Sequence, residues 1–276
     1  MSGPGGRSNV DRGATVLVTN DDGVGSPGLA ALVRAVARPG RQVVVAAPST
    51  DQSGPSAAVA PRAVDGVRVE RVPIAGLDEP GFEDVISYAV DGPPALAVLG
   101  ARLGELGRPA ASASVVASGV NLGPNTGVAV LFSGTVGAAM AAANLGLSGL
   151  AMSIDAFEPA HFDTATAVAA AAVDWLLDAP AGTVLNVNVP DRPLDRLAGV
   201  RQAPLATLGT FEAAVQERGA EPFLAQFEIG RQEPEAGTDA ALLGDGWVTV
   251  TALLGIRSDG EVDMASVIER ALSRAA

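Results

Sequence analysis

Three residue types that build many enzyme sites are missing or nearly missing from this chain of 276 residues. It contains no cysteine, which excludes disulfides and thiolate metal ligands. Its single histidine, His161, excludes a site that needs two or three imidazoles from one chain, as most zinc enzymes do. Any resident metal must therefore be held by oxygen, which points to Mg²⁺, Mn²⁺ or Ca²⁺.

Lysine is also absent, and the formal net charge is −13. Binding to a nucleic acid duplex or an anionic membrane needs clustered positive charge, so we expect neither as a partner. The alanine-rich run 165–177 is interrupted by Thr166 and Asp174 and is too short to span a membrane. The first residues, 1–13, contain no apolar segment of the kind found in signal peptides. They predict a disordered leader and a cytoplasmic protein.

What the chain does contain is an alternation of short apolar runs and helical patterns, with an apolar fraction of 48%. Residues 15–19 read as a buried strand, Ser26 and Pro27 open a helix, and residues 42–48 read as a second buried strand. This order predicts an α/β fold with a mostly parallel sheet and helices on both faces. Further strands are expected at 67–73, 85–90, 114–117, 150–154 and 184–189, and helices at 93–104, 133–146 and 161–177.

After about residue 190 the pattern changes. Strands are expected at 200–203, 223–229 and 247–254 without alternating helices, followed by a terminal helix over 262–275. We therefore predict a catalytic core at 14–190 and a β-rich oligomerisation extension at 191–276. Extensions of this kind are often exchanged between subunits.

Polar residues follow three of the predicted strands, at residues 20–23, 53–56 and 118–121. Loops at the carboxyl ends of parallel strands meet at one crevice, where ligands bind in open α/β sheets. The first loop holds two adjacent carboxylates, Asp21 and Asp22, which suit a hard cation together with a hydroxyl and an amide oxygen. Taken alone, the same residues also fit a polar turn that caps the next helix.

A further signal is the small polar sequence at residues 133–135, which precedes a predicted helix. A helix start of this kind offers backbone N–H groups and hydroxyls to an anion, although taken alone it is a weak signal that ordinary N-capping usually explains. His161 starts a predicted helix, and both a structural and a catalytic role fit that position.

Several segments resemble the motifs of the SurE (survival protein E) nucleotidase family. The segments are VTNDDGVGSPG (18–28), APSTDQSGPS (47–56), SGVNLGPNTG (118–127) and SGTVGAAM (133–140), followed by LNVNVP (185–190), GTD (237–239) and GWVTVTAL (246–253). The resemblance extends from about residue 14 to 255. It implies a Rossmann-like core, a homodimer or homotetramer, and a divalent-metal phosphatase acting on nucleoside 5′- and 3′-monophosphates.

The resemblance also implies site residues. One divalent ion per subunit, Mg²⁺ or Mn²⁺ with Ca²⁺ as an alternative, would be held by Asp21, Asp22, Ser53 and Asn121. An aspartate of the pair would orient or deprotonate a water. The residues expected to bind substrate phosphate are Asn20, Gly54, Ser118, Gly119, Asn125, Ser133, Gly134 and Thr135.

The chain departs from the family pattern at several places. Pro93, Leu96 and Ala97 stand where the family has Thr, Asp and Cys, and Ala141 replaces a frequent glutamate. The segment 128–132 is apolar where acidic residues and a tyrosine are usual, and 208–211 replaces an arginine-containing turn. We expect retained metal binding with a changed substrate preference or changed subunit contacts.

Two functions remain open at this point. The first is a metal-dependent phosphomonoesterase acting on nucleotides or another small phosphorylated metabolite. The second is a weakly active or non-catalytic metabolite-binding or scaffold protein of the same fold. A nucleotide-dependent transferase is a third option, for which the sequence offers no second-substrate pocket.

Overall fold

The computed structural model describes residues 13–54, 56–59, 66–207, 233–256 and 268. Within these residues the strands form one nine-stranded sheet in the order β3-β4-β2-β1-β5-β6-β7-β9-β8. The strands are β1 (Thr15–Thr19), β2 (Gln42–Pro48), β3 (Val69–Arg71), β4 (Ile86–Val90), β5 (Val115–Leu122), β6 (Ser148–Ile154), β7 (Val184–Val189), β8 (Gly199–Gln202) and β9 (Trp247–Leu253).

The centre of the sheet is parallel, from β4 through β2, β1, β5 and β6 to β7. β1 and β6 are buried along their whole length, which is why their sequences are runs of apolar and small residues rather than alternating patterns. β3 and β9 pair antiparallel with β4 and β7, and β8 lies parallel to β9. After β1 the chain adds β2 on one side of it, and later it adds β5 on the other side. The order of the strands therefore reverses between β1 and β5.

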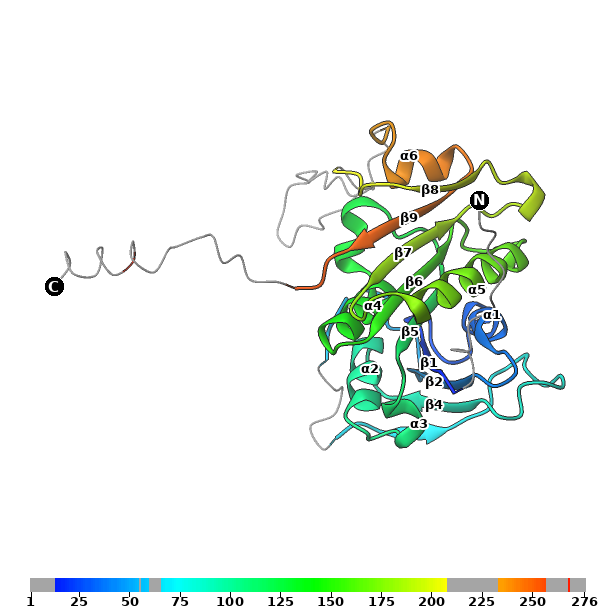
Figure 1. Ribbon diagram of the computed structural model, residues 1–276, viewed down its shortest axis with the longest axis vertical. Helices are drawn as coiled ribbons and strands as arrows, with labels where there is room; N and C mark the ends of the chain where they lie inside the picture. Colours follow the sequence, from blue (N-terminus) through cyan, green and yellow to red (C-terminus); the bar gives the residue numbers. More distant parts are fainter. Residues whose placement is uncertain (1–12, 55, 60–65, 208–232, 257–267, 269–276) are drawn as a thin grey trace, which may run out of the picture.

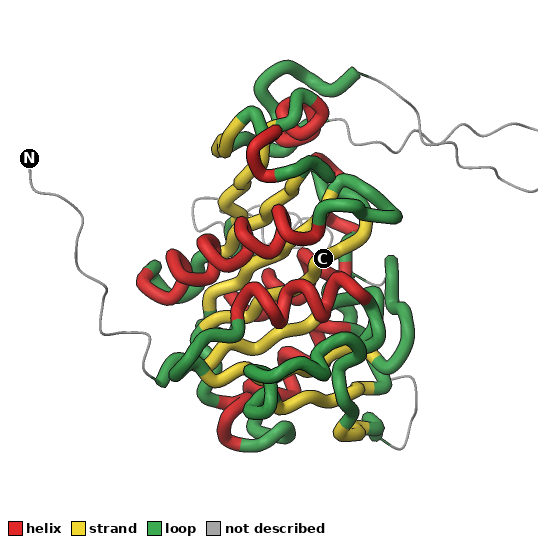
Figure 2. The backbone as a smooth tube through the Cα atoms, turned by 90° about the vertical axis from the view of Figure 1, so that its right-hand side faces the viewer, coloured by secondary structure: helices red, strands yellow, loops and turns green. Residues whose placement is uncertain are grey.

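Helices cover both faces of the sheet (Figure 1). They are α1 (Pro27–Val36), α2 (Pro94–Arg102), α3 (Arg108–Ala111), α4 (Gly134–Asn144), α5 (Phe162–Asp178) and α6 (Asp239–Gly244), with 3-10 turns η2 (Gly127–Phe132) and η3 (Leu194–Arg196). Figure 2 shows α1 and α5 lying across one face, and both contribute to the largest apolar cluster. α2, α3 and α4 pack against the other face. The predicted α/β architecture is confirmed.

The two faces follow from the alternation of side chains along β1. Val16 and Val18 point toward α1, whereas Leu17 points toward α2 and α4. The cap predicted for α1 is present, because the Ser26 hydroxyl accepts a hydrogen bond from the backbone N–H of Leu29 and Pro27 is the first helical residue.

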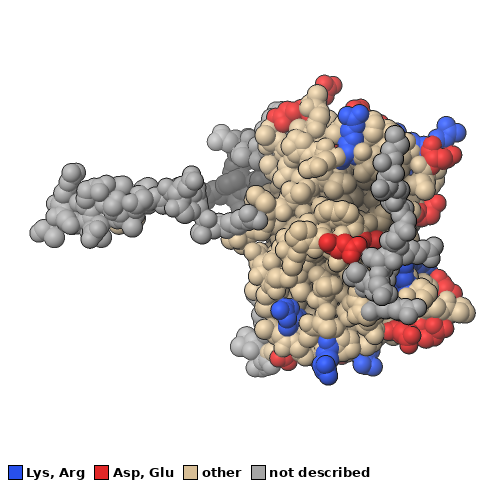
Figure 3. Space-filling view, viewed as in Figure 1, with Lys and Arg blue, Asp and Glu red and all other residues tan. Residues whose placement is uncertain are grey.

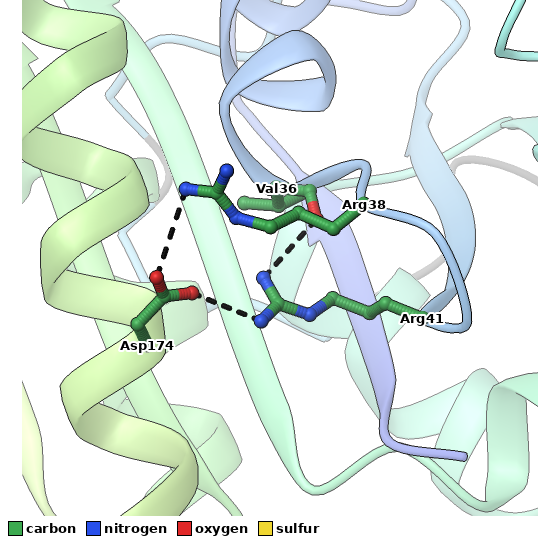
Figure 4. A network of polar contacts seen from close by, with 4 residues as sticks. All are labelled: Val36, Arg38, Arg41 and Asp174. Atoms are coloured by element: carbon green, nitrogen blue, oxygen red, sulfur yellow. Dashed lines mark hydrogen bonds and ion pairs between the residues drawn. The ribbon is translucent and has the colours of Figure 1, made fainter. Parts of the chain in front are cut away.

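α5 is also tied to the loop before β2 by charge (Figure 4). The Arg41 side chain is fully buried, and its Nη2 lies 2.9 Å from Asp174 Oδ1 on α5. Arg41 Nη1 donates to the carbonyl of Val36 at 3.2 Å, and the more exposed Arg38 lies 3.6 Å from the second oxygen of Asp174. This network fixes the end of α1 and the start of β2 against α5.

Two expectations about elements are wrong. The residues 118–121 are not a loop after a strand ending at 117, because β5 continues through them to Leu122 with an irregular register between Ser118 and Asn121. The region after 190 does contain a helix, α6, between β8 and β9. The predicted strand 223–229 and terminal helix 262–275 lie outside the described residues.

The outer surface carries few charges on the face seen in Figure 3, where acidic and basic groups are scattered among uncharged residues. In the described ranges, no helix is both long and apolar enough to cross a membrane.

Candidate active site

The end of β1 meets two other segments of the chain at the point where the strand order reverses. The backbone N–H of Gln52, after β2, donates to the carbonyl of Asp21 at 2.7 Å, and Val24 N–H donates to Pro48 O at 2.8 Å. On the other side, Thr19 pairs with Ser118 of β5. The loops after β1 and β2 and the end of β5 therefore come together, as expected for the carboxyl edge of a parallel sheet.

Asp21 is buried and faces the first turn of α4. One of its oxygens accepts a hydrogen bond from the backbone N–H of Thr135 at 3.1 Å, and the other accepts from the Thr135 hydroxyl. Gly134 lies against the same carboxylate, so that a Cβ added at Gly134 would stand 2.8 Å from Asp21 Oδ2. Only glycine allows this approach, which brings the N-terminus of α4 onto the end of β1.

Asp22 is half-buried, and its Oδ2 is enclosed without a hydrogen-bond partner. Burial raises the pKa of Asp22 to about 7, aided by the negative charges of Asp21 and Asp51, while a hydrogen bond with the Leu122 backbone opposes the rise. Burial also raises the pKa of Asp21, although the hydrogen bonds from Thr135 oppose it. Two neighbouring buried carboxylates stabilise a cation or retain a proton.

Asp51 is a third carboxylate at this edge, and the sequence analysis did not single it out. Its Oδ1 accepts hydrogen bonds from both the backbone N–H and the hydroxyl of Ser53, each at 2.7 Å. An acidic residue two positions before the candidate ligand Ser53 was the available signal. Ser53 and Gly54 are exposed at the mouth of the site.

Asn121 lies near the end of β5, where its side-chain amide donates to Gly123 O at 2.7 Å. Gly119, two residues earlier, has φ +128, and a Cβ there would lie 2.2 Å from Met152 O, so β5 needs glycine to pass this close to β6.

Several oxygens at this edge are buried without a hydrogen-bond partner. They belong to Thr19, Asn20, Asp22 and Ser118, all at the ends of β1 and β5. Buried acceptors of this kind are normally satisfied by a ligand, an ion or water. Carboxylate, hydroxyl and amide oxygens are ligands that a hard divalent cation accepts, and Asp21, Asp22, Ser53 and Asn121 carry them at this edge. No three carboxylate or imidazole side chains in the described part of the chain are grouped to hold a metal, so a cation here would depend on the hydroxyl and amide oxygens as well.

The remaining predicted phosphate-binding residues have three kinds of surroundings. Asn20, Gly134 and Thr135 lie around Asp21 and Asp22, and the Asn20 amide donates to Gly23 O and to the Ser26 hydroxyl. Ser133 caps α4, because its hydroxyl accepts from Val136 N–H at 3.1 Å. The Asn125 side chain is buried and donates to Ser153 Oγ at 2.9 Å, and Ser153 is the β6 partner of Asn121.

His161 lies at the N-cap of α5, where its backbone N–H donates to Asp191 at 2.8 Å.

Comparison with known proteins agrees with this arrangement. The family model described as "Survival protein SurE" matches residues 16–211. The chain belongs to the SurE family. The motif resemblance is therefore confirmed, and its first four segments lie at the ends of β1, β2 and β5 and the start of α4.

Relatives in the SurE family match most of the chain. The 5′-nucleotidase SurE of Aeromonas hydrophila is 37% identical over 243 residues, covering 86% of this chain and 91% of its own. The 5′/3′-nucleotidase SurE of Erwinia tasmaniensis is 34% identical, covering 86% of this chain and 89% of its own. The crystal structure of the SurE protein from Aquifex aeolicus superposes with a TM-score of 0.73 at 29% identity, covering 93% of this chain and 99% of that one.

Proposed function

We propose that this protein is a divalent-metal-dependent phosphatase that hydrolyses nucleoside 5′- and 3′-monophosphates or a related small phosphorylated metabolite. The observation that carries the proposal is the pair of adjacent carboxylates at the end of β1, of which Asp21 lies against the N-terminus of α4 and Asp22 has an enclosed oxygen without a hydrogen-bond partner. The names of its relatives, 5′-nucleotidase and 5′/3′-nucleotidase, support the same reaction class.

One divalent ion per subunit, Mg²⁺ or Mn²⁺, would be held by Asp21, Asp22, Ser53 and Asn121. When bound, such an ion neutralises phosphate oxygens and makes a water more acidic. Without it, burial raises the pKa of both carboxylates, and the charges of Asp21 and Asp51 raise the pKa of Asp22 further, which is the electrostatic reason to expect a cation here.

The chain's own groups would bind the substrate phosphate and orient the attacking water. In the first turn of α4 the N–H groups of Thr135 and Val136 are already bonded to Asp21 and Ser133. The start of α4 would therefore act on a substrate phosphate through the helix dipole, which favours an anion there. Asp21 is held by Thr135 and is set to orient a metal ligand or an attacking water, whereas Asp22 has an oxygen free of protein hydrogen bonds and can accept a proton.

The apolar turn η2 leads directly into this helix start. Leu131 is 70% exposed and Phe132 is 53% exposed, where acidic residues and a tyrosine were expected from the family pattern. We propose that the exposed side chains of Leu131 and Phe132 favour substrates whose leaving group presents an apolar or aromatic surface.

The test is a phosphate-release assay with Mg²⁺ or Mn²⁺ across nucleoside monophosphates and sugar phosphates. Asp21→Asn should lower kcat/KM at least about a hundredfold. This loss exceeds the one usual for a residue that only hydrogen-bonds a metal ligand. Asp174→Asn on α5 is the matched control and should retain wild-type activity. Full activity of Asp21→Asn would refute the scheme. Measurable Mn²⁺ binding without turnover of any substrate would favour the metabolite-binding alternative.

We also propose a homodimer or homotetramer. An apolar groove of about 620 Å³ lies between α5 and strands β7, β8 and β9, away from the candidate active site. Trp175 and Val200 line it and are 56% and 63% exposed. A second copy of the chain would bury this surface, whereas a mass near 27.5 kDa in light scattering would contradict the assembly.

A further inference from the structure

The segment that leads into η2 is held by buried polar side chains from β6 and β7. Asn188 Oδ1 accepts from the backbone N–H of Asn125 at 2.7 Å, and the amides of Asn186 and Asn188 both donate to the Asn125 carbonyl, at 2.8 and 3.0 Å. Because these groups are buried, the contacts form in a low-dielectric environment where a lost partner is costly.

The same segment is held from a third direction by Asp239, the first residue of α6. The residue is 0% exposed. Its Oδ2 accepts from the backbone N–H of Gly127 at 3.0 Å, and its Oδ1 accepts from those of Ala206 and Ala240 at 2.9 and 2.8 Å. Backbone N–H groups from η2, from the chain after β8 and from α6 thus stabilise one buried carboxylate.

η2 connects this anchor to the candidate active site. It begins at Gly127 and runs into the Ser133 cap of α4. Near its end the Ser56 hydroxyl donates to Leu131 O at 2.7 Å. Thr135, in the first turn of α4, then contacts Asp21. The segment is therefore fixed at one end by Asp239 and at the other by Asp21.

We propose that Asp239 is a positioning residue, which sets η2 and the N-terminus of α4 against Asp21. Its kinetic consequence rests on the proposed phosphatase activity. The part of the chain after residue 190 thus supports the site directly, because Asp239 of α6 holds η2.

Asp239→Asn tests the Gly127 contact selectively. The amide retains one oxygen, and the orientation that keeps Ala206 and Ala240 bonded presents its NH₂ group to the N–H of Gly127. The variant therefore loses the bond to η2 and adds a donor–donor contact there, while preserving size.

We expect Asp239→Asn to lower kcat/KM about tenfold and to raise the inhibition constant of orthophosphate by a similar factor, because a hydrogen bond to a charged group is lost. The assay is run well below the melting temperature. Asp174→Asn, which disturbs a charged contact on α5, should keep both constants within about twofold of wild type. Unchanged kinetic constants in Asp239→Asn, with only a lower melting temperature, would overturn the proposal.

The path through α4 is tested by a double-mutant cycle with Thr135→Val. If Asp239 acts through the position of Thr135, the double variant should lose less activity than the product of the two single losses. Multiplicative losses would contradict that path. Should Asp239→Asn fail to fold, Asn188→Ala, which frees the same segment at Asn125, should show the same rise in the orthophosphate constant, and a wild-type constant there would overturn the proposal.

Hydrogen exchange separates this inference from the proposed function. In the metal-free protein, Asp239→Asn should accelerate amide exchange across 128–136, beyond the contact itself, whereas Asp174→Asn should not. Faster exchange supports the positioning role even if wild-type protein hydrolyses no phosphomonoester, which would refute only the phosphatase. Unchanged exchange across 128–136 would refute the positioning role.

Discussion

At the scale of single residues, two neighbouring aspartates have different surroundings. Both oxygens of Asp21 receive hydrogen bonds from Thr135, whereas Oδ2 of Asp22 is enclosed without one. Burial raises the pKa of each, and it is opposed by the hydrogen bonds from Thr135 at Asp21 and by one with the Leu122 backbone at Asp22. Under the proposed function, Asp22 is the group at which a proton and a cation would compete.

The first prediction concerns pH. Because the pKa of folded Asp22 is raised to about 7 from 3.8, the folded protein binds a proton that the unfolded chain releases. In metal-free protein the free energy of unfolding should therefore fall as pH rises from about 4 to about 7. Asp22→Asn should reduce this slope in urea titrations across that range. An identical slope in the variant would contradict the assignment.

The second prediction concerns the Asp21 support. Thr135→Val removes the hydroxyl that donates to Asp21 and keeps the side-chain shape and the backbone N–H. A hydrogen bond to a charged group contributes about 1.5–3 kcal/mol, so metal-dependent kcat/KM should fall roughly tenfold or more. Thr164→Val, which removes a buried hydroxyl on α5 that donates to Arg192 O, serves as the comparison and should act mainly on stability. Equal kinetics in Thr135→Val and wild type would show that the hydroxyl is dispensable.

At the scale of elements, the helices hold the sheet edge through a few buried polar anchors. α5 is joined to the loop before β2 by Arg41 and Asp174, and α4 is joined to β1 by Thr135 and Asp21. The first anchor lies on the α1–α5 face and the second at the candidate site, so they can be disturbed separately (Figures 2 and 4).

The third prediction compares the loss of the Asp174 carboxylate with the loss of one of its two arginine partners, Arg38. Asp174→Ala removes a carboxylate partner from the buried Arg41 and should lower the free energy of unfolding by about 1–3 kcal/mol. Arg38→Ala breaks only a more exposed ion pair and should cost less than about 1 kcal/mol. Urea denaturation measures both. A larger loss in Arg38→Ala would reverse the proposed order.

At the scale of the whole molecule, the sheet continues past the core that the sequence predicted. β8 and β9 extend it beyond β7, and α6 brings Asp239 onto η2. The region after residue 190 thus contributes to the same layer as the site instead of forming a separate attachment.

The fourth prediction is a global effect of the metal. A ligand that binds only the folded state stabilises it by about 2.7 kcal/mol at a hundred times its Kd. For a chain of this size that corresponds to a melting temperature roughly 5–10 °C higher with saturating Mn²⁺, reversed by chelation. Asp22→Asn should not respond, and Asp174→Asn should respond like wild type. A Mn²⁺ response retained in Asp22→Asn would place the ion elsewhere.

The sequence by itself determined the α/β order, the α1 cap and the gathering of polar residues at the ends of β1, β2 and β5, because these depend on local periodicity, capping and the common edge of a parallel sheet. The adjacent aspartates were visible for the same reason. Only the tertiary structure decided that Asn125 turns to Ser153, that Asp51 joins the carboxylates, and that Asp239 holds Gly127. The two hydrogen bonds join residues 28 and 112 positions apart, and the effect of Asp51 on Asp22 arises only when the chain is folded. A local sequence pattern therefore cannot predict them.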